Sequence, residues 1–421
     1  MTIKTITNEF EISVDRSSTP KSEGEGTHQL QVEFSALHSS PLDHYSDLYQ
    51  SWLQLFQNDK CAAMQQHPDY VLRMASIISK NESTPSAYLM HCRINGKLIA
   101  TGIFLPKRLS TKALKGLGPV RFLQGYFLCG NRFLLAPEVE HDEDLLIRLV
   151  ELSVNFCQKQ KQSFLLLEDL RVDEPLGKIT QQKNQHYSIY SHTEFQDRSL
   201  IQFTANPLDY WNQFRSKSLR KHKRLLRKNS DMQIVKISEP DQIAYFLEAA
   251  HQISLNTWQT QRLGLRIKND EEELEQMMFM AMNGWLRSYL LLKDDKPVAF
   301  KVGYQHQNVF HDVEIGFDLN YSSVSPGETL LLLILNDMIE NDTPHTFDFG
   351  GGDAEYKQRF SSEITRSRSV CLFPSTFKNN LLAFHLKSSR LIDLGMRETL
   401  KATGVYTAIR QLARYGKLGS R

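Results

Sequence analysis

The chain of 421 residues lacks the patterns that mark metal-binding, disulfide-linked and membrane-spanning proteins. Its five cysteines are scattered without a Cys-x-x-Cys pair, and its fourteen histidines include no His-Glu-x-x-His motif. These absences argue against a zinc site or a disulfide scaffold, and they fit a reducing cytoplasm. No segment approaches about 18 uninterrupted apolar residues, and the N-terminus has no basic start followed by an apolar core. We therefore expect a cytoplasmic protein without a signal peptide, a membrane span or a metal.

A charge excess and two nucleotide-binding fingerprints are also missing. The net charge is only +2, so the overall charge does not call for nucleic acid. Gly350-x-Gly352 does not complete a dinucleotide fingerprint because Glu355 stands where the third glycine is needed, and no Gly-Lys-Ser/Thr of a P-loop follows. Apolar content of 41% and charged content of 23% are typical of a soluble globular protein. The length predicts two or three domains.

Two candidate ligand-facing turns stand out in the second half of the chain. In the first turn, Ser325 is expected to be an N-cap, Pro326 the first helical residue and Glu328 the return partner of a capping box. An apolar run follows, which predicts a buried helix. A helix start offers free N–H groups and a positive dipole end, which suit a phosphate. The same residues also make a good cap in any protein.

The second turn follows a short predicted strand, 346–349, which leads into three glycines where backbone can approach a ligand closely. Asp353 is expected to cap one further helical turn. Asp353, Tyr356 and Lys357 then fall at positions i, i+3 and i+4, on one face of that turn. A carboxylate, a phenol and an ammonium on one face can bind and polarise a polar substrate.

The same order of elements occurs twice along the chain, which predicts a duplicated α/β domain of mixed sheet. Each copy contains a hairpin, a strand, a helix and a strand, with hairpins at 88–104 and 286–304. The two copies differ at the start of their helices. Five carboxylates that would repel a phosphate stand at the first one, namely Glu138, Glu140, Asp142, Glu143 and Asp144. We infer that only the second copy binds an anionic donor, and that the first is structural or binds the acceptor.

Two basic segments complete the pattern. Eight of the fourteen residues in 215–228 are Lys or Arg, with leucines on one helical face, which predicts a basic amphipathic helix. It is either a solvated helix or a wall that faces a nucleotide, an RNA or an anionic lipid headgroup. The segment 376–421 carries nine Lys/Arg against two Asp/Glu, with helical stretches at 381–394 and 405–415. It is expected to lie on an acidic membrane surface, on a partner or on the second domain.

The stretch from about Ser216 to Phe360 resembles the GNAT-fold acetyltransferases called CelD-like, which are associated with polysaccharide biosynthesis. More distantly, the tandem arrangement is similar to FemAB-type aminoacyl transferases, which use aminoacyl-tRNA on cell-wall precursors. The combination of motifs is typical of the GNAT superfamily, although no single motif is specific for it. The residues that carry the resemblance are Ser218-Leu-Arg-Lys221, Asn256-Thr257-Trp258-Gln259, Pro297-Val298-Ala299, Ser325-Pro326-Gly327, Phe347-Asp348-Phe349-Gly350 and Tyr356-Lys357.

The resemblance implies tandem GNAT-like domains and acyl-coenzyme A, with acetyl-CoA as the expected donor. The polar composition of residues 1–28 predicts a mostly disordered arm. The expected parts after it are a domain with a degenerate donor site at 29–200, an acyltransferase domain at 201–375 and a basic helical tail at 376–421. The donor pyrophosphate would lie at the turn formed by Ser325, Pro326, Gly327, Glu328 and Thr329. This turn departs from the usual Arg/Gln-x-x-Gly-x-Gly/Ala loop because it has a single glycine.

Acyl transfer needs a base for the acceptor, a polarised donor carbonyl and alignment of the two. Alternation along 309–317 predicts Asp312 and Glu314 on one strand face, and either is a candidate base. Asp348 is expected to orient the acceptor and Tyr356 to protonate the leaving thiolate. Lys357 is expected to neutralise developing charge or to hold an anionic substrate, or else to form an ion pair with Asp348 or Asp353. Residues expected to touch the substrate are Trp258, Arg220, Lys221 and Arg224, and Trp258 alternatively fills core.

Three functions remain open at this point. The first is an acyl-CoA-dependent N- or O-acetyltransferase that acts on a sugar, an amino sugar or an envelope precursor in the cytoplasm. The second is an aminoacyl-tRNA-dependent transferase, which the basic segment 215–228 favours. The third is a non-catalytic protein of envelope assembly, recruited to the inner membrane face or to the synthesis machinery through its basic tail.

Overall fold

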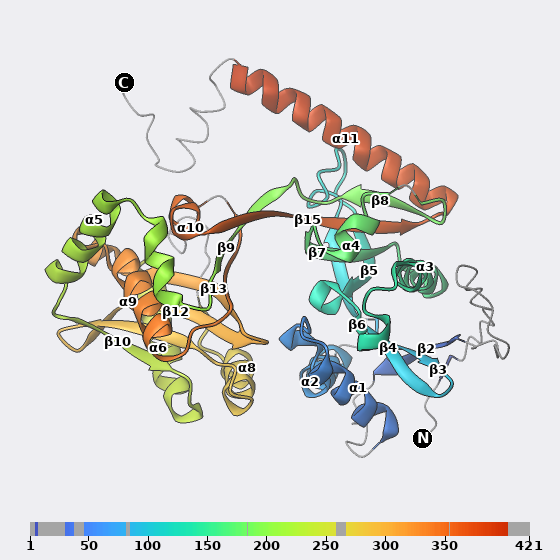
Figure 1. Cartoon of the computed structure of the whole chain (residues 1–421). Helices are drawn as coiled ribbons and strands as arrows, with labels where there is room; N and C mark the ends of the chain where they lie inside the picture. Colours follow the sequence, from blue (N-terminus) through green and yellow to red (C-terminus); the bar gives the residue numbers. More distant parts are fainter. Residues whose placement is uncertain are drawn as a thin grey trace, which may run out of the picture. The chain divides into compact units, whose positions relative to one another are not determined.

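The computed structural model describes residues 5–6, 30–37, 46–80, 85–182, 184–257, 267–352 and 354–402 (Figure 1). The chain divides into two compact units. Unit 1 consists of 1–195 together with 367–421, and unit 2 consists of 196–366. Residues 367–375, which the sequence assigns to the second domain, therefore belong with unit 1, because the strand that they form pairs with strands of that unit.

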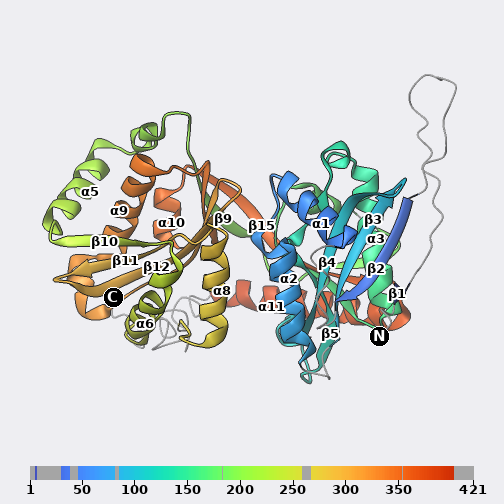
Figure 2. The same cartoon turned by 90° about the horizontal axis from the view of Figure 1, so that it is seen from below.

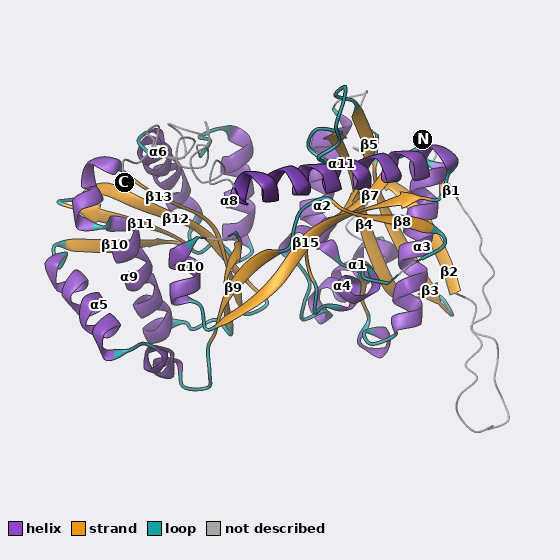
Figure 3. Ribbon diagram, turned by 90° about the horizontal axis from the view of Figure 1, so that it is seen from above, coloured by secondary structure: helices purple, strands orange, loops and turns teal. Residues whose placement is uncertain are grey.

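Unit 1 is a mixed sheet with helices packed on it. Its C-terminal helix α11 runs beside β8 (Figures 1 and 3). Cys371 is fully buried in β15, as expected for a packing residue. Its elements are β1 (Thr5–Ile6), β2 (Leu30–Leu37), α1 (Asp47–Asn58), α2 (Pro68–Ser79), β3 (Ala87–Ile94), β4 (Lys97–Ser110), β5 (Phe122–Leu128), β6 (Leu134–Leu135), α3 (Glu143–Lys159), β7 (Phe164–Arg171), α4 (Pro175–Ile179), β8 (Tyr187–Ser191), β15 (Glu363–Pro374) and α11 (Phe377–Ala402).

Unit 2 has a second mixed sheet with helices on both faces. Figure 2 shows α5, α9 and α10 over one face and α6 and α8 over the other. We call these the α9 face and the α6 face. Its elements are β9 (Gln196–Gln202), η4 (Pro207–Gln213), α5 (Ser216–Lys228), β10 (Met232–Ile237), α6 (Ile243–Leu255), α8 (Glu271–Met282), β11 (Ser288–Lys293), β12 (Lys296–His306), β13 (Val309–Phe317), η6 (Leu319–Val324), α9 (Pro326–Asn341), β14 (Thr346–Gly351) and α10 (Glu355–Phe360).

The two sheets repeat one topology. Unit 1 has the strand order β2-β3-β4-β5-β7, and unit 2 has the order β10-β11-β12-β13-β14. In both sheets the first three pairings are antiparallel and the last is parallel, with α3 or α9 connecting the parallel pair. The predicted α/β class, with duplicated mixed sheets flanked by helices, is confirmed.

One strand at the end of each repeat pairs with a strand that is distant in the sequence. In unit 1, β15 pairs antiparallel with β7, although it follows the whole of unit 2 in sequence. In unit 2, β9 pairs antiparallel with β14, although it follows directly on unit 1. Local sequence patterns carry no information about such distant partners, so this exchange was not predicted.

The hairpins form where two adjacent residues accept positive φ angles. Asn95 and Gly96 have φ of 51° and 79°, and Asp294 and Asp295 have φ of 49° and 60°. Two-residue turns with both φ values positive match the twist of the flanking strands, and Asn, Asp and Gly tolerate that region best. Both hairpins predicted from these turns are confirmed.

The tail forms one long helix as far as it is described. The expected stretch 381–394 lies within α11, and the expected stretch 405–415 lies outside the described residues. No helix among the described residues is long and apolar enough to cross a membrane.

Candidate functional site

The candidate site of unit 2 lies where the parallel pairing of β13 and β14 stops. The two strands pair only over Val309–His311 and Thr346–Asp348. Beyond this point β13 continues to Phe317 and β14 to Gly351 without further pairing between them. The chain leaves β13 through η6 and enters α9. Gly327, in the first turn of α9, faces Phe317 at the end of β13, because a Cβ added to Gly327 would lie 3.3 Å from the Phe317 ring. The open strand ends and the start of α9 therefore share one edge, the place where open α/β sheets bind ligands.

The turn before α9 differs from the predicted cap. The helix begins at Pro326 as expected, but Ser325 has left-handed angles, φ 51° and ψ 56°, and its side chain makes no capping hydrogen bond. The capping-box prediction for Ser325 and Glu328 is therefore wrong. Instead, the Ser325 carbonyl accepts from the backbone N–H of Thr329 at 3.0 Å and from its hydroxyl at 3.1 Å. Left-handed geometry at a non-glycine residue is strained, and such strain collects at functional turns.

The end of α5 holds this turn in place. The Asn229 amide donates to the Val324 carbonyl at 2.8 Å and to the Thr329 hydroxyl at 2.7 Å. Lys228 donates to the Ser323 carbonyl at 3.3 Å. Asn229 is buried and was missed by the sequence analysis, although its position at the C-terminal end of a basic helix is the signal that could have identified it.

Glu328 connects three helices rather than capping one. Its carboxylate accepts from Arg359 of α10 at 3.0 Å and lies 3.7 Å from the Lys221 ammonium of α5. Both cations are near the first turn of α9, so Glu328 partly neutralises the positive charge that a donor phosphate would meet there.

A β-bulge separates the two carboxylates that alternation places together. Glu314 lies opposite Val302 and Asp312 lies opposite Gly303, so Val313 is an extra residue in the strand. A bulge of one residue shifts the following side chains to the other face. Asp312 therefore points to the α9 face and Glu314 to the α6 face, and the prediction that they share a face is wrong.

Asp312 is locked in an ion pair with a residue that was not predicted. The Lys301 ammonium donates to Asp312 at 2.6 Å, and the two side chains are 0% and 4% exposed. Burial lowers the pKa of Lys301, while the Asp312 charge acts in the opposite direction. In the sequence, the signal for this ion pair is a lysine inside the otherwise apolar run 298–302, with Asp312 on the next strand. This pairing leaves Asp312 poorly placed to accept a proton from a substrate.

Glu314 is the second carboxylate of β13. It is half-buried on the α6 face, and burial raises its pKa with a further contribution from the Glu273 carboxylate of α8. The same effects of burial and neighbouring carboxylates raise the pKa of Glu273. A carboxyl group with a raised pKa is a better proton acceptor near neutral pH than an ordinary one.

Asp348 lies at the last position of β14 that pairs with β13, and it is held from three sides. Arg198 of β9 donates through Nε at 3.0 and 3.1 Å, and the Gly350 N–H donates at 2.8 Å. Burial acts to raise the pKa of Asp348, but Arg198, His311 and these hydrogen bonds together lower it. The His311 ring lies 3.9 Å from the carboxylate and stacks on Tyr304 at 4.6 Å. Burial lowers the pKa of His311 to about 4.

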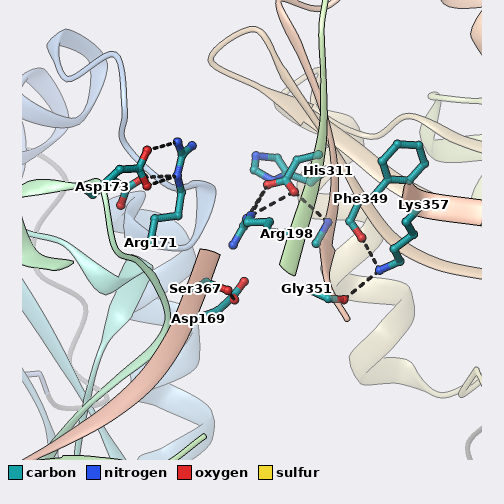
Figure 4. Close-up of polar contacts among 12 residues, drawn as sticks. Asp169, Arg171, Asp173, Arg198, His311, Phe349, Gly351, Lys357 and Ser367 are labelled. Carbon is teal, nitrogen blue, oxygen red and sulfur yellow. Dashed lines mark hydrogen bonds and ion pairs between the residues drawn. The ribbon is translucent and has the colours of Figure 1, made fainter. Parts of the chain in front are cut away.

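Lys357 and Tyr356 lie together at the start of α10. Lys357 donates to the carbonyls of Phe349 at 2.6 Å and Gly351 at 2.9 Å, at the end of β14 (Figure 4). The ammonium thus stabilises strand carbonyls that β13 leaves unpaired. Tyr356 packs edge-on against Phe349, and burial raises the pKa of its phenol, which the Asp312 charge reinforces. Asp353 and Trp258 lie outside the described residues.

The basic helix α5 presents its cations outward. Its buried side carries His222, Leu225 and Leu226, which pack against core or aromatic residues of the α9 face. Eight cations are exposed on the other side, namely Arg215, Lys217, Arg220, Lys221, Lys223, Arg224, Arg227 and Lys228. Among the described residues, Arg220 and Arg224 have no ion-pair partner, so their charge is available to an anion.

Comparisons with known proteins find a matching family for part of unit 2. Residues 213–358 match the family described as Acetyltransferase (GNAT) domain. The matched segment lies within unit 2. The match runs from α5 to α10 and includes every described site residue discussed above except Arg198 and Arg359. No curated protein matches the chain.

Solved structures resemble the chain well beyond this domain. The structure of FemX is similar with a TM-score of 0.55 and 10% identity, over 79% of this chain and 96% of that one. The C-terminal domain of a putative lysylphosphatidylglycerol synthetase from Agrobacterium fabrum is similar with a TM-score of 0.47 and 12% identity, over 80% of this chain and 94% of that one. The FemX likeness shows a shared fold.

Proposed function

We propose that unit 2 transfers an acyl group from acyl-CoA, with acetyl-CoA as the donor, to a nitrogen or oxygen of a sugar, an amino sugar or another envelope polysaccharide precursor. The observation that carries the proposal is the shared edge where β13 and β14 stop pairing and α9 begins. The GNAT match supports acyl transfer, and the polysaccharide acceptor rests on the CelD-like resemblance of the sequence.

The donor would bind along this edge. The first turn of α9 offers free N–H groups and a positive dipole end to the pyrophosphate. The strained Ser325 and the buried Asn229 fix the turn in place, which reduces the ordering that a ligand must impose. The exposed cations Arg220 and Arg224 of α5 add favourable charge for the remaining phosphate.

Glu314 is the better candidate base of the two carboxylates in β13. It would take the proton of the attacking amine or hydroxyl, since its pKa is raised and Asp312 is engaged by Lys301. Tyr356 keeps its proton at neutral pH because its pKa is raised, so it can donate to the leaving thiolate. Asp348 would orient the acceptor through the Arg198 and His311 cluster rather than as a free carboxylate.

The first test is calorimetric titration with acetyl-CoA. Gly327→Glu places a carboxylate at the first turn of α9, and we expect binding to weaken at least about tenfold because charge repulsion replaces dipole attraction. Gly327→Ala is the matched control. Its Cβ meets the Phe317 ring at 3.3 Å, so only a small adjustment is needed and binding is retained. Equal binding by wild type and Gly327→Glu would contradict the donor site.

A second candidate function, aminoacyl-tRNA-dependent transfer, is favoured by the exposed cations of α5 and by the FemX-like fold. If tRNA binds here, its affinity falls steeply with salt because phosphate contacts release counterions. We expect Arg220→Glu/Arg224→Glu to weaken that binding and to flatten its salt dependence. Lys236→Glu/Lys296→Glu makes the same charge change at exposed strand positions of unit 2 and serves as the control. Filter binding with total tRNA measures both, and salt-insensitive or absent binding removes this candidate.

A further inference from the structure

The outward side of α11 carries an apolar stripe. Its side chains are unusually exposed, with Phe377 at 88%, Leu381 at 60%, Phe384 at 69%, Leu391 at 71% and Ile392 at 52%. The first four follow one another at helical spacings of four, three and seven residues, so they line one face of the helix. Isolated exposed apolar residues are common, but a contiguous row of this size marks an interaction surface.

The opposite side of α11 already has its partner. Ala383 and Leu386 are buried in a cluster with Phe164, Tyr190 and Phe373 of unit 1. The helix is therefore anchored by one face, and the outward stripe is not needed for its attachment. A helix that is anchored by one face and apolar on a second face presents the second face to a binding partner outside unit 1.

The charges that flank the stripe from Phe377 to Leu391 are positive. No Asp or Glu occurs from residue 367 to residue 392, and exposed Lys378 and Lys387 stand on the two flanks; the next carboxylates along the chain are Asp393 and Glu398. The sequence beyond the described helix, 403–421, adds four Lys/Arg and again no Asp or Glu. Basic flanks with bulky apolar residues between them are the composition of helices that lie in the interface of anionic membranes.

A groove beside the helix has the same charge. It encloses about 570 Å³ and is lined by amide and hydroxyl side chains, by the apolar Ile189 and Phe195 and by two cations, with no carboxylate among these lining residues. The cations are Lys387 of α11 and Arg368 of β15. The Arg368 guanidinium lies 4.9 Å from the Phe195 ring and donates to the Ser191 hydroxyl at 3.1 Å. A phosphate headgroup fits this chemistry, because a guanidinium held by hydrogen bonds and an ammonium line the same groove.

We propose that α11 docks on an anionic lipid surface, with the stripe from Phe377 to Ile392 inserted among the acyl chains and the Lys387–Arg368 groove facing headgroup phosphates. The alternative of a second copy is less favoured, because two such helices would bring their basic flanks together. The proposal does not depend on the acyl-transfer site, since it concerns residues of unit 1.

Vesicle flotation of the full chain tests the proposal. We expect binding to vesicles of phosphatidylcholine with phosphatidylglycerol, weaker binding to phosphatidylcholine alone, and a loss of about tenfold or more in Phe384→Asp/Leu391→Asp. Tyr245→Asp/Met282→Asp is the matched control, because it makes the same charge change at exposed apolar positions of unit 2. Lys387→Gln should reduce the preference for the anionic vesicles.

Absent vesicle binding would overturn the proposal, as would an equal loss in the control. A dimer in analytical ultracentrifugation that dissociates in the α11 variant would assign the stripe to a second copy instead.

If the aspartate variant misfolds, Phe384→Cys in a Cys61→Ser background, labelled with an environment-sensitive fluorophore, replaces it. A blue shift on anionic vesicles supports docking, and an unchanged spectrum contradicts it. Acetyl-CoA titration of the same variants reports separately on the function of unit 2.

Discussion

Lys301 shows how one residue can restrict the chemistry available to a site. A lysine with no exposed surface is costly to bury, and only the Asp312 carboxylate compensates its charge among the described residues. This requirement ties Asp312 to a structural partner. The candidate base of β13 is then the other carboxylate, Glu314, which lies on the far side of the bulge.

The buried pair makes a prediction about stability. Asp312→Asn leaves the Lys301 charge without compensation, and we expect the free energy of unfolding to fall by about 3–5 kcal/mol. Lys301→Met/Asp312→Leu replaces both charges by apolar groups of similar volume, and we expect its stability to lie much closer to that of the wild type. Urea unfolding of the three proteins measures the difference. A double variant as unstable as the single one would mean that the pair contributes more than mutual charge compensation.

The turn at Ser325 shows what sequence can predict at the scale of a residue. The start of α9 at Pro326 follows from proline's fixed φ and from the apolar run behind it, and it is confirmed. The cap chemistry was not predictable, because Ser-Pro-Gly-Glu is compatible with two backbone states. The contacts of Asn229, which lies about a hundred residues earlier in the chain, accompany the left-handed state.

At the scale of elements, three adjacent strands of unit 2 are connected through Asp348. Arg198 of β9 and His311 of β13 approach this carboxylate of β14 from either side. The cluster stands at the last rung of the parallel ladder. It therefore helps to hold the strands together at the point where they part, and it fixes the width of the opening that a donor would enter.

This cluster predicts a pH dependence of stability. The pKa of His311 is lowered from 6.5 to about 4, so the folded state binds its proton less tightly than the unfolded state does. Stability is then lost as pH falls from about 6.5 through about 4. We expect His311→Gln to lose less stability over this interval than the wild type. Urea midpoints at pH 7, 5.5 and 4.5 measure it, and parallel curves for the two proteins would refute the assignment.

Most elements were predictable because their signals are local. Patterns within about twenty residues predict the hairpin turns, the strand β14 that leads into three glycines, and the helices α3 and α9. The bulge at Val313 was not, because one inserted residue leaves the apolar and polar alternation of β13 looking regular. Its consequence for the site was large, since it moved Glu314 to the other face.

At the scale of the whole molecule, the two units have separate cores. Phe34 stacks on Phe156 at 4.0 Å in unit 1, and Phe310 packs on Phe347 at 4.7 Å in unit 2. All four rings are buried. A change in one core therefore perturbs the packing of its own unit first.

These separate cores predict two transitions in calorimetric unfolding. Phe156→Ala should lower the midpoint of one transition and Phe347→Ala that of the other, each by several degrees, because removing a buried ring costs about 3–5 kcal/mol. Acetyl-CoA should raise only the transition that Phe347→Ala lowers, since a ligand stabilises the unit that binds it. A single transition shifted by both variants would show that the units unfold together.

The exchange of strands between the two halves of the sequence also dictates an order of events on the ribosome. The segment 196–366 is complete before β15 has been fully synthesised, so its sheet can close while β7 of the preceding unit still shows an open edge. That edge is covered only when residues 367–374 emerge, after the whole of unit 2. From residue 171 until residue 367 is made, a nascent chain of this protein thus carries an apolar strand with one unpaired edge. Chaperones that shield such edges are expected to matter more for its yield than for the stability of the finished molecule.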